Sequence, residues 1–192
     1  SIRRQRQMCI RDRVDCFDTM VEIVSVAGNN RLGGDDFDRL IAEHFLREHG
    51  VARQQLRAQE YAVLLKQAER CKKLLSEQDE VVMHATVGDQ LYESTYTMDR
   101  LFEESKALLK EIRQVIGRAL KDGKMTIHDV DLVVMAGGSS KMPLIQKYIR
   151  HLFHKAPMVQ GNCDELIALG LGLVCGAVSY THLRAHETLA NL

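Results

Sequence analysis

One stretch decides the fold class: Leu132-Val133-Val134-Met135-Ala136-Gly137-Gly138-Ser139-Ser140-Lys141-Met142-Pro143. Its first five residues are all apolar, which is typical of a strand that is covered on both faces. Two glycines follow, and Pro143 then stands where a helix tolerates proline best, in its first turn. A buried strand that passes through a glycine turn into a helix predicts an α/β protein.

The same alternation extends toward the N-terminus. The run 20–27 is rich in valine and isoleucine and ends at Gly28-Asn29-Asn30, which indicates a strand closing in a turn. Elsewhere, apolar residues recur at helical spacing or alternate as in strands. We expect an α/β framework with a mixed α+β subdomain inserted at about residues 50–100. The remaining predicted elements are a helix opened by Asp35-Asp36, a helix at about 55–75, strands at 81–84 and 90–97, and helices at 98–120, 143–153 and 164–178.

The composition excludes several classes of partner. The 192 residues contain 26 basic and 26 acidic side chains, so the net charge of zero gives no field that attracts nucleic acid or membrane. The five cysteines are scattered without a CxxC pair, which favours a reducing, cytoplasmic setting. The apolar stretch 166–178 is shorter than a membrane span. We therefore expect no nucleic-acid partner and no membrane partner.

The two ends of the chain differ from the rest. Residues 1–13 carry five arginines against one aspartate, and both this arm and residues 179–188 resemble translated sequencing-adapter read-through. We expect residues 1–13 and 179–192 to be non-native and the domain to occupy residues 14–178. A basic arm that binds nucleic acid, or a targeting peptide, is the alternative for the first segment.

Paired glycines occur twice before a predicted helix. Gly33-Gly34 and Gly137-Gly138 expose backbone N–H groups at a helix N-terminus, where a phosphate or a base edge can approach without a Cβ in the way. The spacing from Gly28 to Gly33 fits GxxxxG, but the lysine and hydroxyl of a Walker loop do not follow. A plain tight turn is the alternative at each place.

Four polar residues share one face of the predicted helix 55–75. Glu69, Lys72, Lys73 and Ser76 are spaced i, i+3, i+4 and i+7. Glu69 could accept hydrogen bonds from ribose hydroxyls, and the aliphatic stem of Lys73 could lie against a purine. The alternative is an ordinary solvated face whose Glu–Lys pair contributes only ~0.3 kcal/mol.

Two further patterns do not support a site. His182 and His186 are four residues apart but lack a third ligand, so we expect no metal site. Ser139 and Ser140 have no histidine near them in sequence, and we expect no catalytic nucleophile.

Taken in order, these segments resemble the second lobe of the ATPase domain of seventy-kilodalton heat-shock (DnaK-type) chaperones, within the actin-like ATPase fold. The resemblance covers roughly residues 14–178, and the stretch Ala27–Asp38 is similar to the HscC-like branch. It implies one lobe only, in which a sheet with flanking helices carries an inserted mixed α+β subdomain. It also implies an incomplete central sheet, because the family's phosphate loop should lie just upstream of Val14.

The resemblance implies nucleotide contacts in four segments. The adenosine-facing helix has lysine at 73, where many members have arginine or an aliphatic residue. The adenosine loop has lysine at 141, which lacks the planar guanidinium that stacks on a purine. The implied binding residues are Gly33, Gly34 and Asp36 beside the phosphates, Glu69, Lys72, Lys73 and Ser76 on the helix, Gly137, Gly138, Ser139 and Lys141 in the loop, and Asp164 before the last helix.

The resemblance also implies a function. The intact protein would bind ATP or ADP with magnesium between two lobes and couple hydrolysis to binding and release of unfolded polypeptides. Its partners would include a J-domain co-chaperone and a nucleotide-exchange factor. For this chain we expect an adenosine-binding wall without ATP hydrolysis, because phosphoryl transfer depends on positioning by charges from both lobes. Another actin-like ATPase, such as a sugar kinase or an actin relative, and a non-catalytic co-chaperone docking module are the alternatives.

Overall fold

The structure is a computed structural model that describes residues 9–17, 20–30, 32–88, 90–159 and 170. The fold is mixed α/β, but in the described residues the strands come as two antiparallel pairs, each followed by helices, and do not alternate singly with helices as the sequence predicts. The elements are β1 (Cys9–Phe17), β2 (Met20–Asn29), α1 (Gly34–Glu48), α2 (Ala58–Leu74), β3 (Glu80–Val87), β4 (Gln90–Thr97), α3 (Met98–Glu104), α4 (Lys106–Asp122) and α5 (Pro143–Phe153), with short 3-10 helices at Arg53–Gln55, Ile127–Asp129 and Gly138–Lys141.

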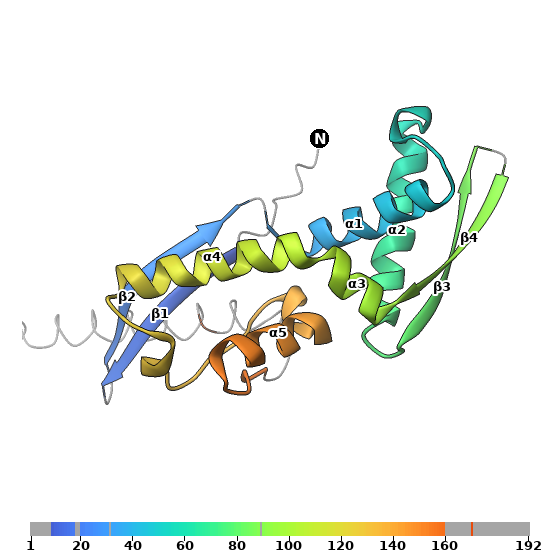
Figure 1. The fold of residues 1–192 in the computed structure, drawn as a ribbon. Helices are drawn as coiled ribbons and strands as arrows, with labels where there is room; N and C mark the ends of the chain where they lie inside the picture. Colours follow the sequence, from blue (N-terminus) through green and yellow to red (C-terminus); the bar gives the residue numbers. More distant parts are fainter. Residues whose placement is uncertain (1–8, 18–19, 31, 89, 160–169, 171–192) are drawn as a thin grey trace, which may run out of the picture.

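The first two strands form an antiparallel pair that α4 covers (Figure 1). Their register runs from Cys9 opposite Asn29 to Phe17 opposite Met20, with an irregularity between Arg13 and Val14. The strand expected at 20–27 is confirmed as β2, while residues 9–13, which the sequence analysis assigns to the N-terminal arm, form the first half of β1. The Ser25 hydroxyl donates a hydrogen bond to the carbonyl of Ala119, 2.8 Å away, and so joins β2 to α4.

A second group of elements contains α1, α2 and the β3–β4 hairpin, which lies at the far end of the molecule from β1 and β2 (Figure 1). The α1 helix packs on α2, and α2 packs on β3. Along β3, Val81, Met83 and Ala85 are buried while Val82 between them is exposed, which is the period of two that a half-covered strand requires. The predicted hairpin is confirmed, with Glu80 opposite Thr97 and Val87 opposite Gln90.

The helix predicted at 98–120 is interrupted. Ser105, fully buried and with φ −80° and ψ −1°, separates α3 from α4. The break lets α3 pack on β4 while α4 packs on β1 and β2, which one straight helix cannot do. Helical periodicity alone did not reveal the corner, because the apolar stripe continues through it.

The strand predicted at 132–136 is not formed, so this prediction is wrong. Within the described part of the chain this segment makes an isolated parallel bridge, Val134 to Met158, and the side chains of Leu132 and Val134 are 54% and 59% exposed. A strand covered on both faces needs neighbouring strands, and β1 and β2 pair with each other instead. The helix α5 that follows is confirmed, with Pro143 in its first turn.

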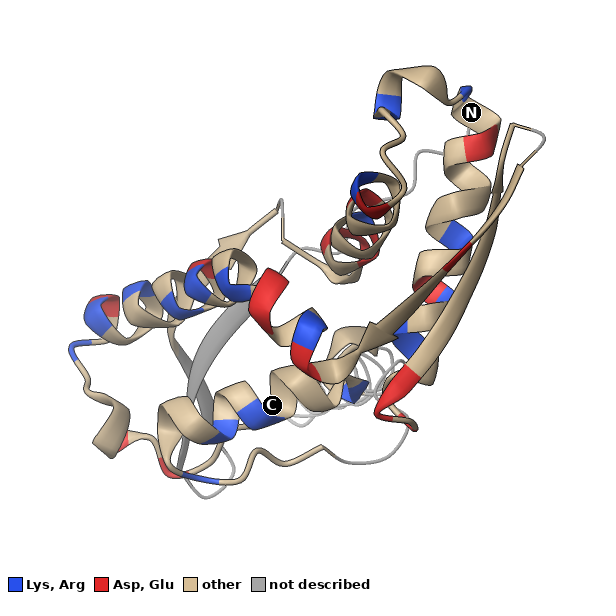
Figure 2. Ribbon diagram, turned by 45° about the vertical axis from the view of Figure 1, so that its right-hand side comes forward, with Lys and Arg blue, Asp and Glu red and all other residues tan. Residues whose placement is uncertain are grey.

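Two other predictions concern the last helix and the possibility of a membrane span. The helix expected at 164–178 lies outside the described residues apart from Gly170. Among the helices of the described ranges, none is long and apolar enough to cross a bilayer. Charges of both signs are spread over the helices (Figure 2), in keeping with the net charge of zero.

Candidate functional site

The first glycine pair caps α1. Gly33 is the N-cap residue, and its N–H donates a hydrogen bond to Asp36 Oδ2 at 2.7 Å. Asp36 also pairs with Arg39 one turn further along the helix. Carboxylates in a first turn suit the positive end of the helix dipole. Asp36 therefore has a local capping role in addition to the phosphate-side position that the resemblance implies for it.

Lys72 joins the polar motif of α2, residues 69–76, to the first glycine pair. From α2 its ammonium donates a hydrogen bond to the carbonyl of Gly34 at 2.9 Å and lies 2.6 Å from Asp38 Oδ1. The side chains of Lys72 and Asp38 are each only 11% exposed. This ion pair is thus a buried cross-link between α1 and α2, and Lys72 is not part of a fully solvated helix face.

The loop formed by residues 137–141 reaches the same place. A Cβ added at Gly34 would lie 3.3 Å from Ser139 Oγ and 3.5 Å from Lys72 Nζ. A bare glycine allows this close approach of backbone to two polar side chains. The three motifs singled out in the sequence therefore converge at Gly34, although they are far apart along the chain.

Glu69 and Lys73 lie on the solvent side of α2. Their side chains form an ion pair of 2.9 Å between Lys73 Nζ and Glu69 Oε1, with 71% of Lys73 and 44% of Glu69 exposed. The hydrogen bond to Glu69 raises the pKa of Lys73, whereas the charge of Lys141 acts in the opposite direction. Lys141 therefore acts electrostatically on Lys73, and both of these lysines are exposed. Ser76 follows the end of α2, and its hydroxyl donates a weak hydrogen bond to the Lys72 carbonyl at 3.4 Å.

The second glycine pair has a conformation that favours glycine. Gly137 has φ +86° and ψ 166°, and the short 3-10 helix that follows begins at Gly138. The hydroxyl of Ser140 donates a hydrogen bond back to the Gly137 carbonyl at 2.6 Å, and Gln146 donates one to the Ser140 carbonyl at 2.8 Å. Ser140 is therefore occupied in shaping the loop, while the hydroxyl of Ser139 faces Gly34.

Asp38 is the site residue that sequence reasoning missed. Burial raises the pKa of its carboxyl, and the hydrogen bond and charge of Lys72 oppose that effect. The signal was present, because Asp38 is spaced i, i+3 and i+7 with Ile41 and Phe45 on the buried face of α1. A carboxylate on the apolar face of a helix becomes buried, and a buried charge needs a cationic partner.

The other predicted residues and surfaces add little. Asp164 lies outside the described residues. Within the described ranges, no cluster of three or more histidine, cysteine or carboxylate side chains could hold a metal ion. A surface hollow on α4, lined by Gln114, Gly117, Arg118 and Lys121, contains none of the predicted site residues, so we rest the site on the contacts at Gly34.

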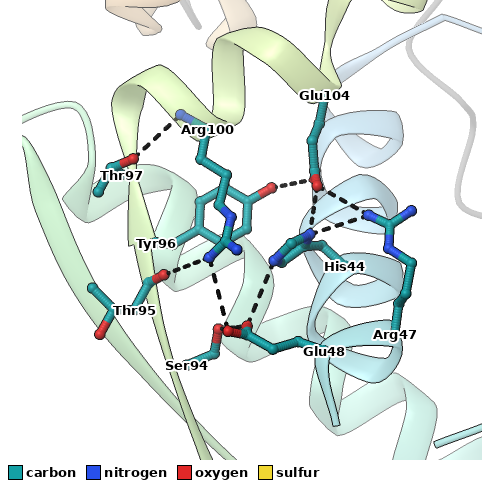
Figure 3. Close-up of polar contacts among 9 residues, drawn as sticks. All are labelled: His44, Arg47, Glu48, Ser94, Thr95, Tyr96, Thr97, Arg100 and Glu104. Carbon is teal, nitrogen blue, oxygen red and sulfur yellow. Dashed lines mark hydrogen bonds and ion pairs between the residues drawn. The ribbon is translucent and has the colours of Figure 1, made fainter. Parts of the chain in front are cut away.

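A separate polar cluster holds α1, the helix whose first turn carries Gly34, against its neighbouring elements (Figure 3). The His44 ring on α1 lies between two carboxylates, paired with Glu104 through Nδ1 and 3.5 Å from Glu48 Oε2 through Nε2. Arg47 forms a second ion pair with Glu104 at 3.0 Å. The cluster joins α1 to β4 and α3 and was not anticipated from the sequence, because its members are close only in the folded chain.

Comparisons with known proteins place the chain in a family. The model of the Hsp70 protein family matches residues 14–189. The chain is 33% identical over 177 residues to the chaperone protein DnaK of Thermotoga neapolitana, covering 85% of this chain and 29% of the relative. It is 34% identical over 154 residues to the chaperone protein HscA homolog of Acinetobacter baumannii, covering 79% of this chain and 24% of the relative. The chain belongs to the Hsp70 family.

Membership of the Hsp70 family decides between this family and other actin-like ATPases. Hsp70 proteins are chaperones that bind ATP with magnesium on an actin-like ATPase fold, so a sugar kinase or an actin relative is no longer needed as an explanation. The chain spans less than a third of the length of these relatives. The activity of a whole Hsp70 protein is therefore a proposal for this chain.

Proposed function

We propose that this chain supplies the adenosine-facing wall of a nucleotide cleft, as the second lobe of an Hsp70-type ATPase domain. One observation carries the proposal: Gly34 lies against both Lys72 and Ser139, so the phosphate-side loop, the adenosine-facing helix and the adenosine loop meet. Two plain turns and an ordinary solvated helix face would have no reason to converge in this way. Their convergence is the arrangement that the family resemblance implies.

The exposed groups of the site have distinct proposed roles. Glu69 accepts hydrogen bonds from the ribose hydroxyls, and the stem of Lys73 lies along the purine. Ser76 meets the base, and Gly137 and Gly138 let the loop backbone approach it closely. The remaining proposed contacts are Lys72 on the helix, Ser139 and Lys141 in the adenosine loop, Gly33, Gly34 and Asp36 beside the phosphates, and Asp164.

For the whole protein we propose an ATP-dependent chaperone of the cytoplasm. ATP hydrolysis would be coupled to binding and release of unfolded polypeptides, with a J-domain co-chaperone and a nucleotide-exchange factor as partners. The proposed HscC-like branch rests on the stretch Ala27–Asp38. Nucleoside contact is the property that we assign to this chain, and phosphoryl transfer would require charges around the γ-phosphate from both lobes.

A titration with ADP tests the proposal. We expect Glu69→Gln to weaken ADP binding by about tenfold, because a hydrogen bond to a charged group contributes about 1.5–3 kcal/mol. The matched control is Glu103→Gln, since Glu103 in α3 forms a comparable exposed ion pair with Lys106 at 2.5 Å. Calorimetry that finds no ADP binding at millimolar concentration, or equal losses in both variants, would contradict the proposal.

A further inference from the structure

We propose that Asp38 is a positioning residue, which acts through Lys72 to hold the Gly33–Gly34 backbone in register with Ser139. The inference rests on the proposed function, because Lys72 belongs to the adenosine-facing motif. It changes the role of Lys72 from a ligand contact to an internal clamp. It also adds Asp38, a residue outside the implied binding set, to the machinery of the site.

The hydrogen-bonding capacity of Lys72 carries the first step. A lysine ammonium has three N–H donors and no acceptor. One donor is directed to the carbonyl of Gly34 at 2.9 Å, and the ammonium also forms an ion pair with Asp38, 2.6 Å from its Oδ1. Two groups of the protein therefore hold the Lys72 ammonium, so the protein itself is the main partner of Lys72.

Burial makes this clamp dependent on both partners. Lys72 and Asp38 are each 11% exposed, whereas the neighbouring Lys73 is 71% exposed and pairs with Glu69 in solvent. Removing one member of a buried ion pair leaves an uncompensated charge, which is far more costly than breaking an exposed pair. Burial raises the pKa of Asp38, and the nearby carboxylates of Glu69 and Asp35 add to that rise, so Lys72 is the group that favours the ionised form.

The Lys72–Asp38 clamp affects the site because the carbonyl that Lys72 holds belongs to Gly34. Gly34 is the first residue of α1, and the N–H of Asp36 bonds back to the carbonyl of Gly33 at 3.2 Å. The place of a Cβ on Gly34 is only 3.3 Å from Ser139 Oγ. A loop that moved away from Lys72 would therefore also lose its spacing to Ser139. The two neighbouring lysines therefore differ in role: Lys72 points inward and holds the Gly34 carbonyl, whereas Lys73 points toward solvent.

Lysine acetylation tests the clamp in the unaltered chain and in one variant. We expect N-hydroxysuccinimide acetate to modify Lys73 much faster than Lys72, because the Lys72 side chain is only 11% exposed and its ammonium bonds the carbonyl of Gly34. In Asp38→Asn, Lys72 should react about tenfold faster while Lys73 is unchanged, in line with the strength of hydrogen bonds between charged groups. Equal reactivity of the two lysines in the native chain, read by mass spectrometry, would overturn the inference.

Hydrogen exchange of the loop tests the positioning itself. We expect the peptide that spans residues 33–37 to exchange about tenfold faster in both Asp38→Asn and Lys72→Met, since each removes one member of the ion pair between α1 and α2. The double variant should exchange no faster than either single one, and Asp38→Glu should keep most of the protection. Lys73→Met is the matched control and should leave this peptide unchanged. Unaltered exchange in Asp38→Asn would refute the role of Asp38.

ADP affinity separates this inference from the proposed function. If the unaltered chain binds ADP and Asp38→Asn binds it at least about tenfold more weakly, both stand. If the chain does not bind ADP but Asp38→Asn still loosens residues 33–37, the clamp stands and the proposed function fails. If Asp38→Asn binds ADP as tightly as the unaltered chain, the positioning inference fails.

Discussion

The hydroxyl of Tyr96 donates a hydrogen bond to Glu104 Oε2, 2.6 Å away, and thereby ties β4 to the last residue of α3 (Figure 3). Burial and the carboxylate of Glu104 raise the pKa of Tyr96, so the phenol stays protonated and remains a donor. The His44 ring meets the Tyr96 ring edge-on, with centroids 5.3 Å apart. The contact thus fixes the hairpin against α1, the helix whose start carries the site.

The change Tyr96→Phe should destabilise the fold by about 1.5 kcal/mol, because it removes a hydrogen bond to a charged acceptor from a site that is 1% exposed. The free energy of unfolding from urea titrations followed by circular dichroism measures the loss. Tyr92→Phe is the control, since the Tyr92 hydroxyl bonds Gln90 in an exposed position. Its effect should stay within about 0.5 kcal/mol, and equal losses in the two variants would refute the assigned role of Tyr96.

Stability should depend on pH through Glu48. The hydroxyl of Ser94 donates a hydrogen bond to Glu48 and lowers the pKa of that carboxyl, with the charge of Arg100 acting in the same direction. A carboxylate whose pKa is lowered by folding stabilises the fold fully above its ordinary pKa and loses that contribution as the pH falls through the lowered value. Ser94→Ala removes the principal cause.

The difference in unfolding free energy between the unaltered chain and Ser94→Ala should therefore be largest at about pH 7 and shrink toward about pH 3. Denaturant titrations at the two pH values measure it. A difference that stays constant with pH would mean that Ser94 contributes only packing.

Gly137→Ala should destabilise the fold by about 1–3 kcal/mol, because φ +86° with ψ 166° is a region that essentially only glycine occupies. Nothing lies within 4 Å of an added Cβ there, so the cost comes from the backbone alone. Gly117 in α4 is the matched control, since its Cβ would also be free of contacts and its backbone is helical. Gly117→Ala should stabilise by about 0.5–1 kcal/mol, and thermal melts that shift in the same direction for both variants would contradict the argument.

Val134→Lys should reduce self-association of the chain. Val134 is 59% exposed in a segment that bridges to Met158 alone among the described residues, and open strand edges pair readily with other chains. A charge at such an edge blocks that pairing, while the stability should change by less than about 0.5 kcal/mol. Light scattering against concentration measures the effect. Val63→Lys is the control, because Val63 is exposed on a helix that has no open edge, and an equal reduction in both variants would point to general solubility.

The spacing of apolar residues predicted the helices and strands whose pattern lies entirely within their own sequence. The helices α1, α2 and α5 and the β3–β4 hairpin follow from apolar spacing, and their bounds differ from the prediction by a few residues. The segment 132–136 has an equally strong apolar pattern, yet it does not form a strand here. An apolar run shows that the segment needs to be buried, but it does not determine whether a neighbouring strand is present to pair with it. The corner at Ser105 was missed for the same reason, because it is imposed by what each helix packs against.

The sequence identified the segments that meet at Gly34 and not the contacts between them. Resemblance to the family identified the motifs at residues 33–36, 69–76 and 137–141, and the structure brings Gly34, Lys72 and Ser139 together. The spacing of α2 placed Lys72 and Lys73 on one face, but one is buried and the other exposed. That difference arises from Asp38 on another helix, and sequence spacing within α2 contains no information about it.

The corner at Ser105 has a mechanical consequence. The N–H of Ser105 donates to the carbonyl of Leu101 at 3.0 Å, and its own carbonyl accepts from the N–H of Leu109 at 2.9 Å. Ser105 therefore takes part in the hydrogen bonds of both helices although the chain bends there. A displacement of Ser105 would act on α3, which packs on β4, and on α4, which packs on β1 and β2.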